Sequence, residues 1–140
     1  MTGALVLVCG ALLPAGSLVA HYPERAEQGA NRDADLWVAS VQRALPSNAV
    51  VISWWSYSTP LWYHRWVLGE RPDITIIDER NILDDGYGTI DSAIAAFLHQ
   101  RPVYVVPPYW ELDRLVATWE TETISTYSGY TDLLRIEAHR

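Results

Sequence analysis

Serines and aromatic side chains gather directly after the first strand that the sequence predicts. From Ser53 to Ser58 the chain reads SWWSYS. A nucleophilic serine needs a general base within hydrogen-bond reach, and His64 follows these serines by one or two helical turns. The sequence offers no acid to orient His64, and Trp and Tyr stand where the strained G-x-S-x-G turn requires glycine. A serine hydrolase is therefore disfavoured, and we expect His64 to be a surface or half-buried residue.

Acidic residues follow the second predicted strand. They are Asp78, Glu79, Asp84 and Asp85. Because Mg²⁺ and Ca²⁺ prefer carboxylate oxygens, a metal-dependent hydrolase that uses the Asp78–Asp85 loop is one hypothesis. Acidic loops are more often solvated, so we rank it third and expect no metal and no cofactor. Neither a G-x-G-x-x-G spacing nor a Walker lysine is present, which disfavours a nucleotide site.

Aromatic residues occupy two of the three loops that should meet at one edge of the fold. In sheets of parallel strands, ligands bind outside the carboxyl ends of the strands. We therefore expect these residues to form a ligand-binding ledge: Trp54, Trp55, Tyr57, Tyr109 and Trp110. Trp and Tyr rings favour half-wet positions, where they stack on a sugar ring or dock against a membrane partner. The alternative is a lid over a small core.

The two adjacent tryptophans of this ledge should point to opposite faces, because side chains alternate along a strand. We expect either Trp54 or Trp55 to lie in the core and the other to lie at the edge. Tyr57 and Trp110 are expected at the edge.

Hydrophobic patterning predicts strands alternating with helices. Strands are expected at 49–53, 73–77 and 102–106, with a hairpin formed by 122–127 and 133–138. Helices are expected at 33–45, from Pro60 to Gly69, at 90–98 and at 112–119. Ser58 or Thr59 should cap the second helix, with Pro60 in its first position. Such alternation implies parallel strands joined by right-handed crossovers.

These elements predict an α/β fold for residues 33–140. We expect a small three-layer sandwich of about three parallel strands with a C-terminal edge hairpin. The chain of 140 residues is acidic, with a net charge of −7, and its ten basic residues are dispersed arginines. Nucleic-acid binding is therefore disfavoured. One cysteine excludes a disulfide framework within the chain.

An uncharged, apolar stretch precedes this domain. Residues 2–20 are long enough to cross a membrane, and no basic residue precedes them as a signal peptide would require. We expect residues 1–21 to be a transmembrane helix, with a cleaved signal peptide and a buried soluble helix as alternatives. Residues 22–32 are polar and are expected to be a linker. Arg25 and Arg32 slightly favour a cytoplasmic domain.

The chain from the first helix to about Val106 resembles the carboxyl-terminal part of a bacterial multi-pass membrane family. The resemblance is carried by 46–52, by the PLWY block from Pro60 to Tyr63, and by 69–77 with its RPD block. That family is protein O-mannosyltransferase-like, of the GT-C class of glycosyltransferases that use lipid-linked sugars. Its relatives often have an acidic, Gly-Asp-containing turn where this chain has WWSY.

The resemblance implies a small exported α/β domain at the cytoplasmic membrane, on the extracytoplasmic side. Such enzymes are expected to carry their catalytic acid in an external loop near the start of a block of membrane helices, so we expect no catalysis by this chain alone. The leading hypothesis is a non-catalytic, membrane-anchored accessory domain that contacts a lipid-linked sugar, an acceptor or a partner subunit. The alternative is a freestanding module that binds a small molecule or sugar.

Overall fold

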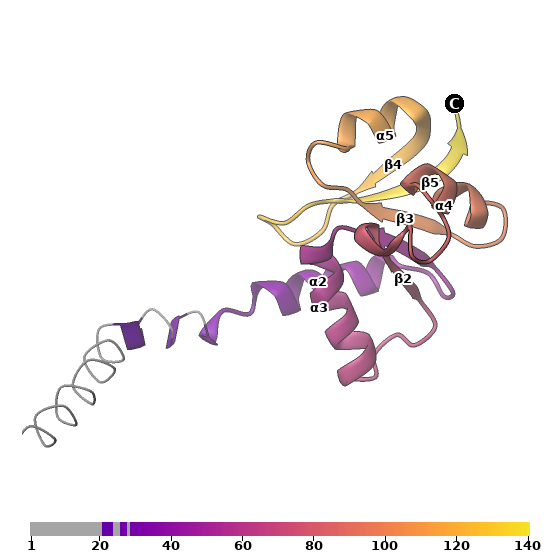
Figure 1. Cartoon of the computed structure of the whole chain (residues 1–140). Coiled ribbons are helices and arrows are strands. Elements are labelled where there is room, and N and C mark those ends of the chain that lie inside the picture. The colour runs from indigo at the N-terminus through magenta and orange to yellow at the C-terminus, as the bar shows by residue number, and fades with distance from the viewer. Residues whose placement is uncertain (1–20, 24–25, 28) are drawn as a thin grey trace, which may run out of the picture. The chain divides into compact units, whose positions relative to one another are not determined.

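The computed structural model describes residues 21–23, 26–27 and 29–140 and divides the chain into two compact units, residues 1–32 and 33–140 (Figure 1). In the first unit, residues 21–23, 26–27 and 29–30 are helical and exposed, within the segment that we expect to be a linker. The predicted membrane segment 2–20 lies outside the described residues. Within the described ranges, no helix is both long and apolar enough to cross a membrane.

The second unit is an α/β domain, as predicted. Its sheet has five strands in the order β2-β1-β3-β5-β4. The strands are β1 (Val50–Ser53), β2 (Thr75–Asp78), β3 (Val103–Val106), β4 (Trp119–Ile124) and β5 (Leu133–His139). The helices are α2 (Asp33–Ala44), α3 (Trp55–Trp62), the π-helical turn η1 (Tyr63–Val67), the 3-10 turn η2 (Glu79–Asn81), α4 (Ile90–Phe97) and α5 (Leu112–Thr118).

The sheet is mixed, with parallel pairing among β1, β2 and β3 and antiparallel pairing of β5. β1 pairs in parallel with β2 and with β3, so Ser53 lies opposite both Asp78 and Val106. β5 pairs antiparallel with β3 and with β4, which places the C-terminal hairpin beside the parallel strands. The carboxyl ends of β1, β2 and β3 therefore meet at one edge, where the sequence analysis expected its ligand-binding residues.

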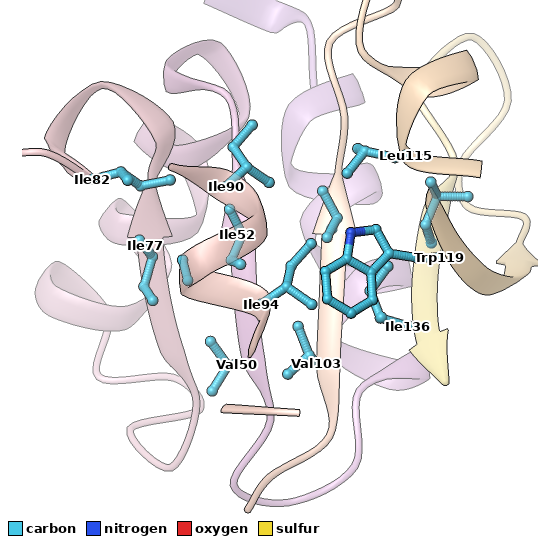
Figure 2. Packing of buried hydrophobic residues seen from close by; sticks show 13 residues of the cluster. Val50, Ile52, Ile77, Ile82, Ile90, Ile94, Val103, Leu115, Trp119 and Ile136 are labelled. Carbon is cyan, nitrogen blue, oxygen red and sulfur yellow. The ribbon is translucent and has the colours of Figure 1, made fainter. Parts of the chain in front are cut away.

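Side chains alternate across β1 and supply two separate cores. Ile52 packs in a cluster with Ile94 of α4 and Leu115 of α5, and Figure 2 shows these side chains meeting on one face of the sheet. Val51 points to the opposite face, where it belongs to a cluster with Trp37 of α2. Helices thus cover both faces of the sheet, and α2 and α3 share the face on which the candidate site is found.

Two helix boundaries differ from the prediction. The helix after β1 begins at Trp55, with Trp54 in the cap position, so Pro60 lies inside the helix and not at its start. The hydroxyl of Thr59 does not cap the helix but donates a 2.9 Å bond to the Trp55 carbonyl, a turn earlier. Trp119 is the first residue of β4 and not the last of a helix, because its backbone is extended.

The RPD block fastens α2 to the start of β2. The Arg71 guanidinium donates to the carbonyl oxygens of Gln42, Leu45 and Pro46 at 2.5–3.0 Å. It also donates two parallel bonds of 2.9 Å to the Asp73 carboxylate. A cation at the carboxyl end of a helix satisfies its unpaired carbonyls and complements its dipole. This block is therefore structural, and it holds the helix that forms one wall of the candidate site.

Candidate ligand-binding site

A π-helical turn follows α3 and places a histidine between two carboxylates. The Leu68 amide donates to the Tyr63 carbonyl five residues earlier, at 3.2 Å. Within this turn His64 points inward and is 8% exposed. Gly69 then reverses the chain with a φ of 73°, in the position that the sequence analysis gave it. Single π-helical turns occur frequently at functional sites, which makes this segment a natural place to look for one.

Both nitrogens of His64 have an acidic partner. Nδ1 lies 2.7 Å from Glu70 Oε2, and Nε2 lies 3.3 Å from Asp35 Oδ1. The hydrogen bond to His64 is the largest cause that lowers the pKa of Glu70 below its usual range. Asp35 comes from α2 and Glu70 from the loop after η1, so the histidine joins two elements. It is more buried than the surface or half-buried position that we expected.

A pocket of about 510 Å³ lies beside this histidine. Its aromatic residues are Trp55, Tyr57, Tyr63 and Tyr130. Its polar side chains are Asp35, Ser56, Thr59 and His64. Aromatic faces combined with a few converging polar groups are typical of small-molecule sites, and the volume lies in the range of such pockets. The pocket is open to solvent, since Trp55 is 45% and Tyr63 51% exposed.

The structure divides the predicted aromatic ledge into two groups. Tyr57 turns away from the carboxyl edge and packs 5.1 Å from the Trp37 ring, and its hydroxyl lies 2.7 Å from Thr131 Oγ1. Trp54 and Trp110 instead meet edge to face at 5.0 Å, and Trp110 meets Tyr109 in the same way at 4.8 Å. Tyr57 and Trp55 therefore line the pocket, with Tyr57 also packed on the core beneath it, while Trp54, Tyr109 and Trp110 form a separate row.

Neither of the adjacent tryptophans lies in the core. Trp54 is partly buried and Trp55 is exposed, contrary to the expectation that one would point inward. β1 ends at Ser53 and α3 begins at Trp55, so the alternation of a strand does not extend to either ring. The Arg80 guanidinium lies 5.3 Å from the Trp54 ring and 4.9 Å from the Trp55 ring, and it links both to the loop after β2.

The acidic loop after β2 does not form a metal site. Among residues 21–23, 26–27 and 29–140, no group of three or more His, Cys, Asp or Glu side chains is arranged to hold a metal ion. Asp84 and Asp85 are exposed, whereas Asp78 is 3% exposed. One oxygen of Asp78 and one of Glu79 are buried and have no hydrogen-bond partner among the residues that the structure describes. Burial, followed by the nearby Glu111 carboxylate, raises the pKa of Glu79.

Two of the three serines of the turn, Ser53 and Ser58, are structural. Ser53 and Ser58 are buried, and their hydroxyl oxygens lie 2.7 Å apart. Ser58 Oγ also lies 3.2 Å from the carbonyl oxygens of Ser53 and Trp54. In the described part of the chain neither hydroxyl contacts a histidine. These bonds fasten the first turn of α3 to the end of β1 and leave neither Ser53 nor Ser58 prepared for nucleophilic attack.

Sequence reasoning found Trp55 and Tyr57 and missed the polar half of the pocket. Asp35 lies 29 residues before His64, so no local spacing rule connects the two. Tyr130 lies in the hairpin loop and reaches the site because it packs on Trp37 with a ring separation of 6.0 Å. Comparison with known proteins leaves the resemblance untested, since no protein family, curated protein or solved structure matches the chain.

Proposed function

We propose that residues 33–140 form a non-catalytic, sugar-binding accessory domain of a membrane glycosyltransferase-like protein. Residues 2–20 would anchor it in the cytoplasmic membrane, with the domain on the extracytoplasmic side. The observation that carries the proposal is the aromatic pocket beside His64, lined by Trp55 and Tyr63 with Asp35 at its polar side. The resemblance to the mannosyltransferase-like family supplies the class of ligand.

The chemistry of the pocket suits a sugar. The apolar C–H face of a pyranose packs on exposed aromatic rings such as those of Trp55 and Tyr63. Its hydroxyls need acceptors and donors close to that stack, and the Asp35 carboxylate and the Ser56 hydroxyl lie in the same pocket. Because Glu70 and Asp35 both contact the His64 imidazole, its ring orientation is fixed before a ligand enters, which lowers the entropic cost of binding.

The proposal is tested by titrating the full chain, in lipid nanodiscs, with hexoses and with a short-chain polyprenyl-phosphate hexose. Trp55→Ala and Tyr63→Ala should each weaken binding at least about tenfold, which corresponds to ~1.4 kcal/mol. The matched control is Trp110→Ala, because Trp110 is equally exposed but lies outside the pocket. Equal loss in all three variants, or the absence of sugar binding, would contradict the proposal.

The membrane anchor has a separate test. The same test distinguishes the membrane-anchored domain from the freestanding module. Residues 2–20 carry no charge, so the full chain with a C-terminal tag should resist carbonate extraction from membranes. Recovery of a mature chain that begins at His21 would instead indicate a cleaved signal peptide. In that case the pocket would belong to a freestanding sugar-binding module and not to a membrane protein.

A further inference from the structure

Four large apolar side chains are exposed where the α3–η1 helix ends. Tyr63 is 51%, Trp66 71%, Val67 65% and Leu68 50% exposed. We call these four residues the η1 tip. In Figure 1 the helix that carries the α3 label runs away from the sheet, and its far end, just before the chain turns back toward β2, projects from the domain.

The four residues of the η1 tip all fall within residues 63–68, one short segment of the chain. Tyr63 and Val67 are four residues apart, close to one helical turn, so they lie near the same side of the helix. The side chain between them, His64, is buried and points toward the domain. Adjacent exposed Trp, Tyr, Val and Leu side chains cost free energy in water and mark interaction sites when they are contiguous.

A cation accompanies these apolar residues. The Arg65 guanidinium lies 4.7 Å from the centre of the Trp66 ring, and it makes no salt bridge among the residues that the structure describes. Trp and Tyr rings are enriched at the level of lipid headgroups, where their apolar body and polar edge are both satisfied. Arginine at the same depth extends its guanidinium to the lipid phosphates while its stem stays apolar.

With residues 2–20 as the proposed anchor, the domain stays close to a membrane. Twelve residues, 21–32, separate the uncharged stretch from Asp33, which begins the domain. Twelve residues span at most about 40 Å even when fully extended. A domain on so short a connection meets the surface of the bilayer that holds the stretch far more often than it meets a freely diffusing protein.

We propose that the η1 tip inserts into the headgroup region of a phospholipid bilayer. Trp66 and Val67 enter the boundary between headgroups and acyl chains, and Arg65 binds a lipid phosphate. Tyr63 belongs both to the η1 tip and to the pocket, so insertion brings the mouth of the pocket to the lipid surface. A sugar linked to a polyprenyl phosphate is presented at that level. This inference rests on the membrane anchor of the proposed function but not on sugar binding.

The test uses the full chain in vesicles of phosphatidylethanolamine and phosphatidylglycerol. Cys9→Ser removes the native thiol, and Val67→Cys carries an environment-sensitive fluorophore. The matched control is Ser128→Cys, which is exposed in the hairpin loop. Nitroxide-bearing lipids should quench the label at 67 and not the label at 128. Iodide in the water should quench the label at 67 at least about twofold less than the label at 128.

Trp66→Ser in the Val67→Cys background should return the label to water, while thermal unfolding stays unchanged because Trp66 is exposed. Equal iodide quenching at 67 and 128 would overturn the inference, whether or not the chain resists carbonate extraction. The carbonate test reports on residues 2–20 alone, so the two failures are distinguishable. A label at residue 67 that stays in water would show that the η1 tip does not insert into lipid and would point to a protein partner instead.

Discussion

Glu70 binds His64 through both its backbone and its side chain. Its amide donates to the His64 carbonyl at 2.9 Å, and its carboxylate lies 2.7 Å from His64 Nδ1. The loop after η1 is thereby closed onto the buried imidazole. His64 also contacts Asp35 of α2. The pair of His64 and Glu70 therefore holds the η1 side of the pocket against α2. The shape of this side therefore depends on the contact between His64 and the Glu70 carboxylate, which is lost when Glu70 is protonated.

Glu70→Gln should lower thermal stability at neutral pH. The bond to His64 holds the pKa of Glu70 below its usual range, so the ionised carboxylate stabilises the folded state above that range. This contribution is lost as the pH falls through the lowered pKa. Melting temperatures of the two proteins should therefore differ at pH 7 and approach each other in acid, as the pH falls below the usual range of a glutamate pKa. Glu120→Gln, exposed on β4, is the control and should show no such trend.

Glu79→Gln should have the opposite effect. Burial and the neighbouring Glu111 and Asp78 carboxylates raise the pKa of Glu79, so its ionised form is disfavoured in the folded protein. The wild type loses stability as the pH rises through that raised pKa, and the neutral variant does not. The variant should melt above the wild type at pH 7 and together with it in acid. A lower melting temperature at pH 7 would show that the Glu79 carboxylate has a stabilising partner.

Tyr57→Ala should cost more stability than Trp110→Ala. Tyr57 packs on Trp37 and Tyr130 and is bonded to Thr131, so its removal should cost about 2 kcal/mol, less than the cost at a fully buried aromatic site. Trp110 is 51% exposed, and its removal should cost less than about 1 kcal/mol. Urea unfolding measures both. Equal losses would contradict the division of the aromatic residues into two groups.

Arg71→Lys should destabilise the domain although the charge is kept. A lysine cannot form the paired bonds to Asp73 while also reaching three carbonyls at the end of α2. The expected loss is about 1–3 kcal/mol in urea unfolding, the range for hydrogen bonds to charged groups. Arg43→Lys, in the exposed last turn of α2, is the matched control. Wild-type stability in Arg71→Lys would refute the structural role of the RPD block.

The parallel part of the sheet was predictable because its strands are short runs rich in Val and Ile, such as 50–52 and 103–106. The start of α3 was not predictable, because Ser58, Thr59 and Pro60 look like a cap and a first helical residue. The buried pairing of Ser53 with Ser58 starts the helix a turn earlier, and such tertiary contacts have no local signature. Trp119 continues a helical spacing but begins β4, where it pairs with His139 of β5.

The candidate site was predictable in part for a similar reason. The rule that ligands bind beyond parallel strand ends identified the loop with Trp55 and Tyr57. Asp35 comes from α2 and His64 from a π-helical turn, and a π-helical turn leaves no sequence pattern that distinguishes it from an α-helix. His64 was taken for an ordinary helix residue because its partners, Asp35 and Glu70, lie on other elements.

Chemical-shift mapping tests the central claim most directly, because it shows where a sugar binds and not only whether it binds. The full chain in nanodiscs, with ¹⁵N-labelled tryptophan, is titrated with a polyprenyl-phosphate hexose. The indole resonance of Trp55, identified from its absence in Trp55→Phe, should shift with the ligand. The resonance of Trp110, outside the pocket, should not shift. Shifts confined to Trp54 and Trp110, or no shift at saturating ligand, would contradict a sugar site beside His64.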